Sequence, residues 1–287
     1  MSKFILGTVQ FGLDYGVNNK QGKLSEESAF EILATAKEMG VSILDTAEVY
    51  GSSHNVIGKF HKRFPQFKFS ISTKLPKDLD NMDVSHIIAK YCIELDVDHI
   101  DYLLFHSFES YFKNKKITSE LEDLKKQNII RKVGVSVYTN EEALICIGDG
   151  FVDVIQIPFN LLDNAYYRGP ILTKAKEKNK IIHTRSAFLQ GLFFVSKGSA
   201  HPAYIKLKQY VAKLENICQN MEISMHDLAL AYCFSNPHID NILIGVDSVE
   251  QLIKNLNSLN IDLPKSIISE IENIKVKDVE FLNPSKW

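Results

Sequence analysis

The stretch SILDTAEVYG, residues 42–51, decides the fold. It begins as an apolar run and then ends abruptly in polar residues, among them Asp45, Glu48 and Tyr50, followed by a glycine. Such a run is typical of a buried parallel strand that emerges at its carboxyl end, which is where α/β proteins build their ligand sites. The stretch therefore predicts a parallel strand with a site at its end, and within it we interpret Glu48 as a residue that is solvated or bonded within the loop.

Short apolar runs of this kind recur along the chain, with amphipathic helical stretches between them, as expected of βα units. The predicted strands are residues 3–8, 42–46, 68–74, 100–106, 132–137, 152–157, 180–184 and 241–245. The predicted helices are residues 25–40, 84–95, 118–128, 140–147, 164–179, 203–220, 225–235 and 248–258. Eight parallel strands with crossover helices in about 250 residues predict a (β/α)8 TIM barrel, with residues 1–287 as one domain. A doubly wound open sheet is the alternative, because periodicity does not show closure, but GTVQFG does not match a Rossmann glycine fingerprint.

Composition narrows the class of partner. The chain has 287 residues, 45% of them hydrophobic, and a formal net charge of −2, which suits a globular protein with a sizeable core. The mixed charges form no basic stripe for nucleic acid, and no apolar run is long enough for a membrane span. We therefore expect a cytoplasmic protein with a small-molecule partner, while its oligomeric state is left open. Four widely spaced cysteines in predicted helices fit neither a disulfide framework nor a zinc site and favour reduced, buried thiols.

Polar side chains follow three consecutive predicted strands at the points where the strands end. Asp45 and Tyr50 follow the second strand, Lys74 ends the third, and His106 ends the fourth. The carboxyl ends of barrel strands gather around one mouth, so these side chains are expected to meet. A lysine and a histidine that close apolar runs also need partners, because a buried unpaired charge is costly.

Together the four residues form a plausible tuned acid. A tyrosine with its ordinary pKa of about 10 is a poor proton donor at neutral pH, but a nearby ammonium group stabilises the phenolate and lowers that pKa. Lys74 would supply the charge, and Asp45 would hold Lys74 in an ion pair. His106 would orient a carbonyl oxygen or relay the proton. Each of these residues alone has an ordinary structural explanation. Their positions at the ends of three consecutive strands predict instead an acid placed beside the carbonyl group of a substrate.

These residues lie in segments that resemble the aldo-keto reductases. In chain order the segments are ILGTVQFG, GVSILDTAEVYGSS, STKL, LDVDHIDYLLFH, IRKVGVSVYT, VIQIPFNLLD, RSAFLQGLF and ILIGVDSVEQLIKNL, which extend over most of the chain. The resemblance implies NAD(P)H-dependent reduction of an aldehyde or ketone. It implies Tyr50 as the general acid, Lys74 and Asp45 as the residues that tune it, and His106 as the residue that orients the substrate.

The resemblance also implies a set of cofactor-binding residues. They are Gly7, Thr8, Asp45, Ser136, Gln156, Arg185, Ser186, Phe188, Gln190, Gly191, Leu192, Gly245, Asp247, Gln251 and Asn255. Two positions depart from the family pattern. Val137 replaces the asparagine that usually follows Ser136, and Arg185 stands where many members stack a tyrosine on the nicotinamide. A guanidinium can lie flat on a ring and can equally reach an anionic substrate.

The residues that match the family's adenosine-binding segment bear on whether the cofactor is NADH or NADPH. NADPH-binding members place lysine or arginine around the 2′-phosphate, whereas this chain has Gly245, Asp247 and Gln251 there. An acidic side chain that accepts hydrogen bonds from a ribose hydroxyl favours NAD over NADP. We therefore expect NADH to be used at least as well as NADPH, although the flexible Lys254 is close enough in sequence to reach a phosphate.

The substrate side is predicted from aromatic and basic residues expected at the mouth. The aromatic residues are Phe11, Tyr15, Phe108, Tyr166, Tyr167, Phe193 and Phe194. Arg168 and Arg185 would add positive charge, which suits a polar and even anionic carbonyl compound such as a sugar or sugar nucleotide. The terminal residue Trp287 would either cover the pocket or dock on the surface.

Two other functions remain compatible with the sequence. In a Schiff-base barrel of the aldolase type, Lys74 would be a desolvated nucleophile. Alternatively, the chain would be a non-catalytic nucleotide-binding subunit or sensor on the same fold, because fold does not imply function.

Overall fold

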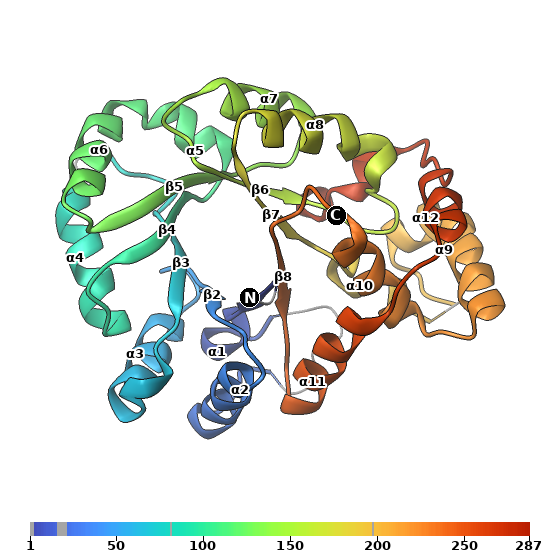
Figure 1. Ribbon diagram of the computed structural model, residues 1–287, viewed down its shortest axis with the longest axis horizontal. Coiled ribbons are helices and arrows are strands. Elements are labelled where there is room, and N and C mark those ends of the chain that lie inside the picture. The colour runs from blue at the N-terminus through green and yellow to red at the C-terminus, as the bar shows by residue number, and fades with distance from the viewer. Residues whose placement is uncertain (1–2, 16–21, 81, 197) are drawn as a thin grey trace.

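The computed structural model describes residues 3–15, 22–80, 82–196 and 198–287 of the chain. Eight parallel strands close into a barrel in chain order, and Figure 1 shows the helices arranged around them. The strands are β1 (Phe4–Gly7), β2 (Ile43–Asp45), β3 (Ser70–Lys74), β4 (Ile100–Phe105), β5 (Ile130–Ser136), β6 (Val154–Pro158), β7 (Ile181–Arg185) and β8 (Asn241–Gly245). Pairing of β1 with β8 closes the sheet, with Gly7 opposite Gly245. The predicted barrel is therefore confirmed, and the open sheet is wrong.

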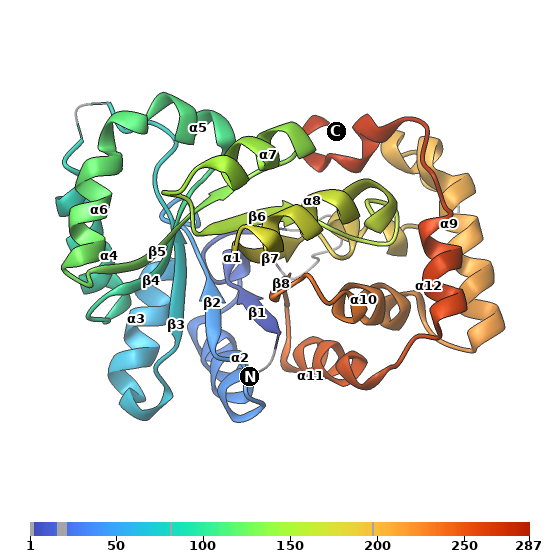
Figure 2. The same ribbon diagram turned by 45° about the horizontal axis from the view of Figure 1, so that its top comes forward.

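Helices alternate with the strands and cover the outside of the barrel. They are α1 (Val9–Gly12), α2 (Glu26–Glu38), α3 (Ser53–Arg63), α4 (Val84–Leu95), α5 (Phe108–Lys113), α6 (Thr118–Lys126), α7 (Asn140–Gly148), α8 (Ala165–Glu177), α9 (Pro202–Met221), α10 (Met225–Ser235), α11 (Val249–Asn257) and α12 (Lys265–Glu272). Figure 2 shows α9 and α12 side by side at the far edge of the molecule, as in Figure 1. All eight predicted helices are present, whereas α1, α3, α5 and α12 were not predicted.

Helix α3 escaped prediction because polar residues occupy its buried face. Ser53, His54 and His61 are buried there together with Val56 and Phe60. His61 donates from Nδ1 to the carbonyl of Leu95 at 2.8 Å and accepts at Nε2 from the Phe69 N–H at 3.2 Å. Satisfied in this way, the histidine is a core residue, but in sequence it interrupts the apolar stripe by which an amphipathic helix is recognised.

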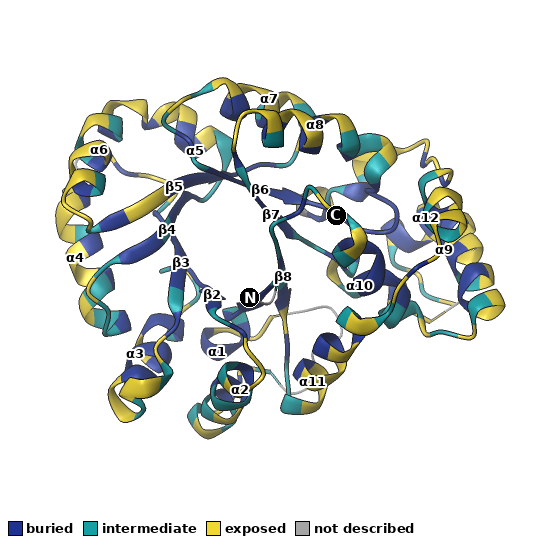
Figure 3. Cartoon of the chain, viewed as in Figure 1, coloured by how far each residue is buried: buried dark blue, intermediate teal, exposed yellow. Residues whose placement is uncertain are grey.

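Side chains that point into the barrel connect strands that are not neighbours in the sheet. The ring of Tyr102 on β4 meets the ring of His183 on β7 edge to face, with centroids 5.0 Å apart. Gln156 on β6 reaches Asp45 on β2 across the interior. Figure 3 shows the strands buried, while the helices alternate between buried and exposed residues. The interior is therefore packed, and its polar residues lie toward the carboxyl ends of the strands.

Other expectations from composition can be compared with the structure. All four cysteines lie in helices, as predicted, and their thiols are free. No helix in the described part of the chain has both the length and the apolar character that crossing a membrane would need. Trp287 lies against His201, with ring centroids 5.1 Å apart, and donates to the carbonyl of Phe281. Of the two alternatives for Trp287, docking on the surface is therefore correct.

We predict that Gly58→Ala destabilises the fold, because α3 and α4 touch at this glycine. A Cβ at Gly58 would lie 1.9 Å from the carbonyl oxygen of Glu94, so one helix would have to move. We expect the free energy of unfolding, measured by urea denaturation, to fall by about 1–3 kcal/mol. The control is Gly148→Ala at the end of α7, where a Cβ meets nothing within 4 Å. Equal effects at the two positions would contradict this account of the contact.

Candidate active site

Four predicted catalytic side chains meet at the carboxyl end of the barrel. Lys74 Nζ lies 2.5 Å from Asp45 Oδ1 and 3.1 Å from the carbonyl oxygen of Thr46. The same ammonium nitrogen is 5.1 Å from the centroid of the Tyr50 ring. His106 lines the same cavity as these three residues. The structure thus brings together the group that the sequence predicted from three strand ends.

Both oxygens of the Asp45 carboxylate are held. Oδ1 forms the ion pair with Lys74, while Oδ2 accepts from Ser72 Oγ at 3.1 Å and from Gln156 Nε2 at 3.0 Å. Asp45 and Lys74 are almost fully buried, with side chains 1% and 4% exposed. A buried ion pair of this kind is stable only when its remaining hydrogen-bonding capacity is satisfied. These contacts fix the position of the Lys74 ammonium group.

The charges of the site set the protonation of Lys74 and His106. Burial by itself lowers the pKa of Lys74, but Asp45 and Tyr50 outweigh burial and raise that pKa above its ordinary value. Burial and the positive charges of Lys74 and Lys77 lower the pKa of His106 to about 4. Lys74 is therefore a cation and His106 a neutral imidazole at neutral pH, so His106 can offer a hydrogen bond without a charge.

The loop that carries Tyr50 is fastened by a cluster of buried hydroxyl groups. Ser53 Oγ lies 2.8 Å from Thr8 Oγ1 and 3.0 Å from Thr46 Oγ1, and Thr8 Oγ1 donates to the carbonyl of Asp45 at 3.0 Å. On the outer side, Glu48 accepts from Lys90 at 2.7 Å and from Tyr91 at 2.8 Å, which ties the loop to α4. Glu48 is therefore half-buried and bonds to α4 rather than to groups of its own loop.

A cavity of about 780 Å³ runs from the four side chains predicted to be catalytic to α11. Its volume is within the ordinary range for a small-molecule site. Among its lining residues are nearly all of the predicted cofactor residues: Gly7, Thr8, Asp45, Ser136, Gln156, Arg185, Ser186, Phe188, Gln190, Gly191, Gly245, Asp247, Gln251 and Asn255. Leu192 is different, because its side chain is 2% exposed and packs in the hydrophobic core. The structure therefore assembles the predicted set without Leu192.

The segment after β7 has an unusual backbone. Ser186, Leu189 and Gln190 have φ values of 62°, 48° and 53°, and Gly191 has 88°. Non-glycine residues seldom adopt this left-handed region, and such conformations concentrate at functional sites. The segment lines the cavity between its two ends, which is where a dinucleotide would pass.

At the far end of the cavity, two polar groups match the adenosine part of a nicotinamide dinucleotide. Asp247 Oδ1 is buried and has no hydrogen-bond partner in the described part of the chain, so it is an acceptor that a ribose hydroxyl would satisfy. Asn255 Oδ1 lies 2.6 Å from His226 Nε2, and the His226 ring stacks on Phe188 with centroids 5.1 Å apart. The residues present therefore fit the cofactor.

The two departures from the family pattern contact each other. Arg185 Nη2 donates to the carbonyl of Val137 at 3.1 Å, and its guanidinium carbon lies 4.1 Å from the centroid of the Tyr138 ring. The Val137 side chain is buried in the core, so only its backbone serves the site. Tyr138 lines the cavity beneath the guanidinium.

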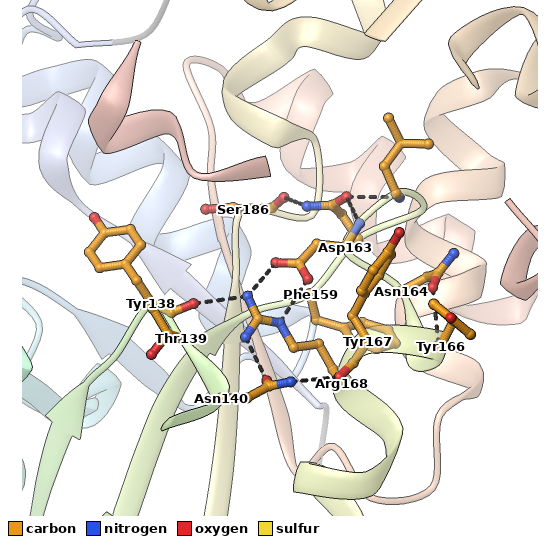
Figure 4. A network of polar contacts seen from close by, with 12 residues as sticks. Tyr138, Thr139, Asn140, Phe159, Asp163, Asn164, Tyr166, Tyr167, Arg168 and Ser186 are labelled. Carbon is orange, nitrogen blue, oxygen red and sulfur yellow. Dashed lines mark hydrogen bonds and ion pairs between the residues drawn. The ribbon is translucent and has the colours of Figure 1, made fainter. Parts of the chain in front are cut away.

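The prediction that Arg168 adds charge to the mouth is wrong. Figure 4 shows its guanidinium enclosed by Asp163, Asn140 and the Tyr138 carbonyl. Nε and Nη2 donate to the two oxygens of Asp163 at 2.7 and 2.8 Å. Burial raises the pKa of the Asp163 carboxyl, and the charge of Arg168 opposes this. Arg168 is therefore a structural residue that ties the start of α8 to the loop after β5.

Most of the aromatic residues predicted at the mouth also lie elsewhere. Tyr15 and Phe194 line the cavity. Phe11 and Phe193 are buried in the core, while Phe108, Tyr166 and Tyr167 pack among other aromatic rings outside the cavity. Sequence shows that an aromatic residue follows a strand but not which way its ring turns.

Three polar lining residues were missed: Gln10, Tyr138 and His226. Gln10 packs on β8, where a Cβ at Gly245 would lie 2.9 Å from its side-chain nitrogen. His226 stands near the start of α10, far in sequence from every predicted site segment. A lone histidine near a helix start carries no distinctive pattern, whereas the position of Tyr138 just beyond β5 could have marked it.

Comparison with known proteins identifies the family. The model of the Aldo/keto reductase family matches residues 3–276. The NADH-specific methylglyoxal reductase of Escherichia coli (strain K12) is 23% identical, with 92% of this chain and 91% of the relative covered. The L-galactose dehydrogenase of Arabidopsis thaliana is 26% identical, with 88% and 86% covered. Aldo-keto reductase AKR11C1 from Bacillus halodurans, in its holo form, shares the fold with a TM-score of 0.78 at 19% identity, with 96% and 92% covered.

The chain therefore belongs to the aldo/keto reductase family. It is an NAD(P)H-dependent oxidoreductase, and its class of reaction is the reduction of small-molecule carbonyl compounds.

We predict that Arg168→Gln destabilises the fold severely, because it leaves the buried Asp163 carboxylate without its cation. The expected loss in the free energy of unfolding is about 3–5 kcal/mol, measured by chemical denaturation. Arg131→Gln is the matched control, since Arg131 is 56% exposed and pairs with Asp101 at 2.9 Å. Loss of this largely exposed guanidinium should cost less than about 1 kcal/mol, because Asp101 keeps the Ile71 N–H as a hydrogen-bond donor. A small effect of Arg168→Gln would show that the network in Figure 4 is not needed for stability.

Proposed function

We propose that the enzyme reduces an aldehyde or ketone to an alcohol with Tyr50 as the general acid. The observation that carries this proposal is the Lys74 ammonium group, held by Asp45 at 2.5 Å and 5.1 Å from the Tyr50 ring. A fixed cation beside a phenol stabilises the phenolate that remains after the proton has left. The buried pair thus supports proton donation by a residue that is otherwise a weak acid.

Each residue has one part in the reaction. A bound nicotinamide cofactor supplies the hydride to the carbonyl carbon. The neutral His106 donates a hydrogen bond to the carbonyl oxygen and orients it toward Tyr50. The Tyr50 hydroxyl gives its proton to that oxygen as the negative charge develops, and Lys74 stabilises the phenolate left behind. The carbonyl gains one hydride and one proton, which balances the reduction.

The same geometry argues against Lys74 as a Schiff-base nucleophile. Such a lysine must be neutral to attack a carbonyl, and enzymes achieve this by lowering its pKa. Here the pKa of Lys74 is raised, chiefly because Asp45 compensates for burial. A positioned cation, rather than a nucleophile, fits this environment.

We expect Tyr50→Phe to reduce kcat/KM by about a hundredfold or more, because a phenylalanine ring has no proton to give to the carbonyl oxygen. Binding of NADH, followed by its fluorescence, should be unchanged, since the phenol is not needed to hold the cofactor. Tyr166→Phe is the control, because Tyr166 is 51% exposed on α8 and lies outside the cavity. Turnover that survives Tyr50→Phe would contradict the role of Tyr50.

We further propose that NADH serves at least as well as NADPH. The carboxylate of Asp247 offers an acceptor to a free ribose hydroxyl and would repel a 2′-phosphate. The NADH-specific methylglyoxal reductase, which is similar over most of both chains, supports the same preference. Lys254 is exposed at the same end of the cavity and is the one lining cation there, among the residues described, that could favour a phosphate.

Asp247→Ser should shift the cofactor preference toward NADPH by about tenfold, which is about 1.4 kcal/mol. The measurement is kcat/KM for NADH and NADPH with one aldehyde at saturation. Asp278→Ser removes an exposed carboxylate outside the cavity and should leave the ratio unchanged. A wild-type enzyme that strongly prefers NADPH, and loses this preference in Lys254→Gln, would overturn the proposal.

The substrate is proposed to be a small polar carbonyl compound. The cavity is lined near Tyr50 by the polar side chains of His106, Tyr138 and Arg185. The names of the relatives, a methylglyoxal reductase and an L-galactose dehydrogenase, point to small oxygen-rich carbonyl compounds.

A further inference from the structure

Arg185 differs from the other arginine near the site and from Lys74 because its charge is not neutralised. Lys74 is paired with Asp45, and the buried Arg168 is paired with Asp163. Among the residues that the structure describes, no carboxylate forms an ion pair with Arg185. Its polar contacts are the Val137 carbonyl at 3.1 Å and the Ser186 hydroxyl at 3.4 Å, both uncharged.

Asp163 is the acidic residue whose charge is known to interact with Arg185, and it cannot serve as the partner. Burial raises the pKa of the Asp163 carboxyl, and the charges of Arg168 and Arg185 oppose this. Both oxygens of the carboxylate already accept hydrogen bonds from Arg168. Two arginines close to one buried carboxylate leave a surplus of one positive charge. That surplus belongs to Arg185, since Arg168 has the close contacts.

The guanidinium of Arg185 is nevertheless held in one place. The guanidinium carbon of Arg185 lies 4.1 Å from the centroid of the Tyr138 ring, so the ring covers one side of the group. Hydrogen bonds to the Val137 carbonyl and the Ser186 hydroxyl hold its N–H groups. A guanidinium has five N–H groups in a fork that matches a carboxylate or a phosphate. Anchored by two uncharged acceptors, Arg185 keeps donors that no group in the described part of the chain satisfies.

Arg185 also lies at the catalytic end of the cavity. It ends β7, just as Lys74 ends the parallel strand β3, and it lines the same cavity as Tyr50 and His106. Burial raises the pKa of Tyr15, and the charge of Arg185 opposes this. Tyr15 in turn interacts with Tyr50 and Tyr138. The unpaired charge is therefore near the site of carbonyl reduction, whereas Asp247 and Lys254 lie at the α11 end of the same cavity.

We propose that Arg185 binds an anionic group of the carbonyl substrate, a carboxylate or a phosphate, so that small oxo acids or phosphorylated carbonyl compounds are preferred over neutral ones. This inference rests on the proposed carbonyl reduction at the same cavity. A partly buried guanidinium without a counter-ion is costly, and an anion on the substrate would repay that cost on binding.

The test compares matched anionic and neutral carbonyl compounds in the wild type and in Arg185→Gln. The pairs are 4-oxobutanoate with its methyl ester, and glyceraldehyde 3-phosphate with glyceraldehyde. We expect the wild type to favour the anionic member of at least one pair by about tenfold or more in kcat/KM. Arg185→Gln should lose this preference, with the neutral compounds changed by less than about threefold. A preference confined to one pair identifies the anion as a carboxylate or as a phosphate.

Two control variants separate this role from general charge effects. Lys213→Gln makes the same change in net charge on the exposed face of α9 and should keep the preference. Arg185→Lys keeps the charge but loses the fork, so it should retain only part of the preference. Binding of NADH, followed by fluorescence, should be the same in all variants.

Three results would overturn the inference. They are equal rates for anionic and neutral compounds in the wild type, an equal fall for both in Arg185→Gln, and weaker NADH binding in Arg185→Gln, which would assign the guanidinium to the cofactor. Absence of turnover of all four compounds by the wild type would overturn the proposed carbonyl reduction alone. Calorimetric binding of 4-oxobutanoate and glyceraldehyde 3-phosphate to the NADH complex would then decide: loss in Arg185→Gln supports the anion site, and unchanged binding overturns it.

Discussion

The buried ion pair between Lys74 and Asp45 is the interaction on which the rest of the site depends. Two charges that are 4% and 1% exposed persist in a protein interior only if their geometry and their other hydrogen bonds offset the loss of hydration. Here β2 supplies the acid, β3 the lysine and Ser72, and β6 the amide of Gln156. Asp45 and Lys74 lie on neighbouring strands, whereas the hydrogen bond from Gln156 depends on the barrel, because β2 and β6 meet only across its interior.

The pair in turn explains the electrostatics around it. Burial and the Lys74 cation together lower the pKa of His106 and favour its neutral form, and the Tyr50 ring lies beside the same fixed positive charge. Reduction of a carbonyl to an alcohol needs a hydrogen-bond donor that orients the carbonyl oxygen and an acid that protonates it. In the proposed mechanism, the neutral His106 and the Tyr50 phenol beside Lys74 are these two groups. The buried ion pair thus places a fixed cation beside both His106 and Tyr50.

The two arginines show how strongly environment decides the role of a residue. Arg168 and Arg185 both border the loop after β5, and each donates to a backbone carbonyl of that loop. Arg168 finds the buried carboxylate of Asp163 and becomes part of the scaffold, whereas Arg185 finds only uncharged acceptors and the face of Tyr138. Arg168 donates to the backbone carbonyl of Tyr138, and the Arg185 guanidinium lies over the ring of the same tyrosine. Arg168 therefore also helps to position Tyr138 beneath Arg185.

The sequence by itself determined the eight strands, the barrel and the four side chains proposed to be catalytic, because apolar runs and the polar residues that end them are local patterns. It missed α3, whose buried face carries histidines satisfied by backbone groups of other segments. It placed Arg168 at the mouth because nothing in the chain shows that Asp163, five residues earlier, is buried with it. The inward or outward turn of each aromatic ring and the joining of His226 to Asn255 were decided only by the tertiary structure. These outcomes depend on contacts between segments distant in sequence, and such contacts exist only once the barrel has closed.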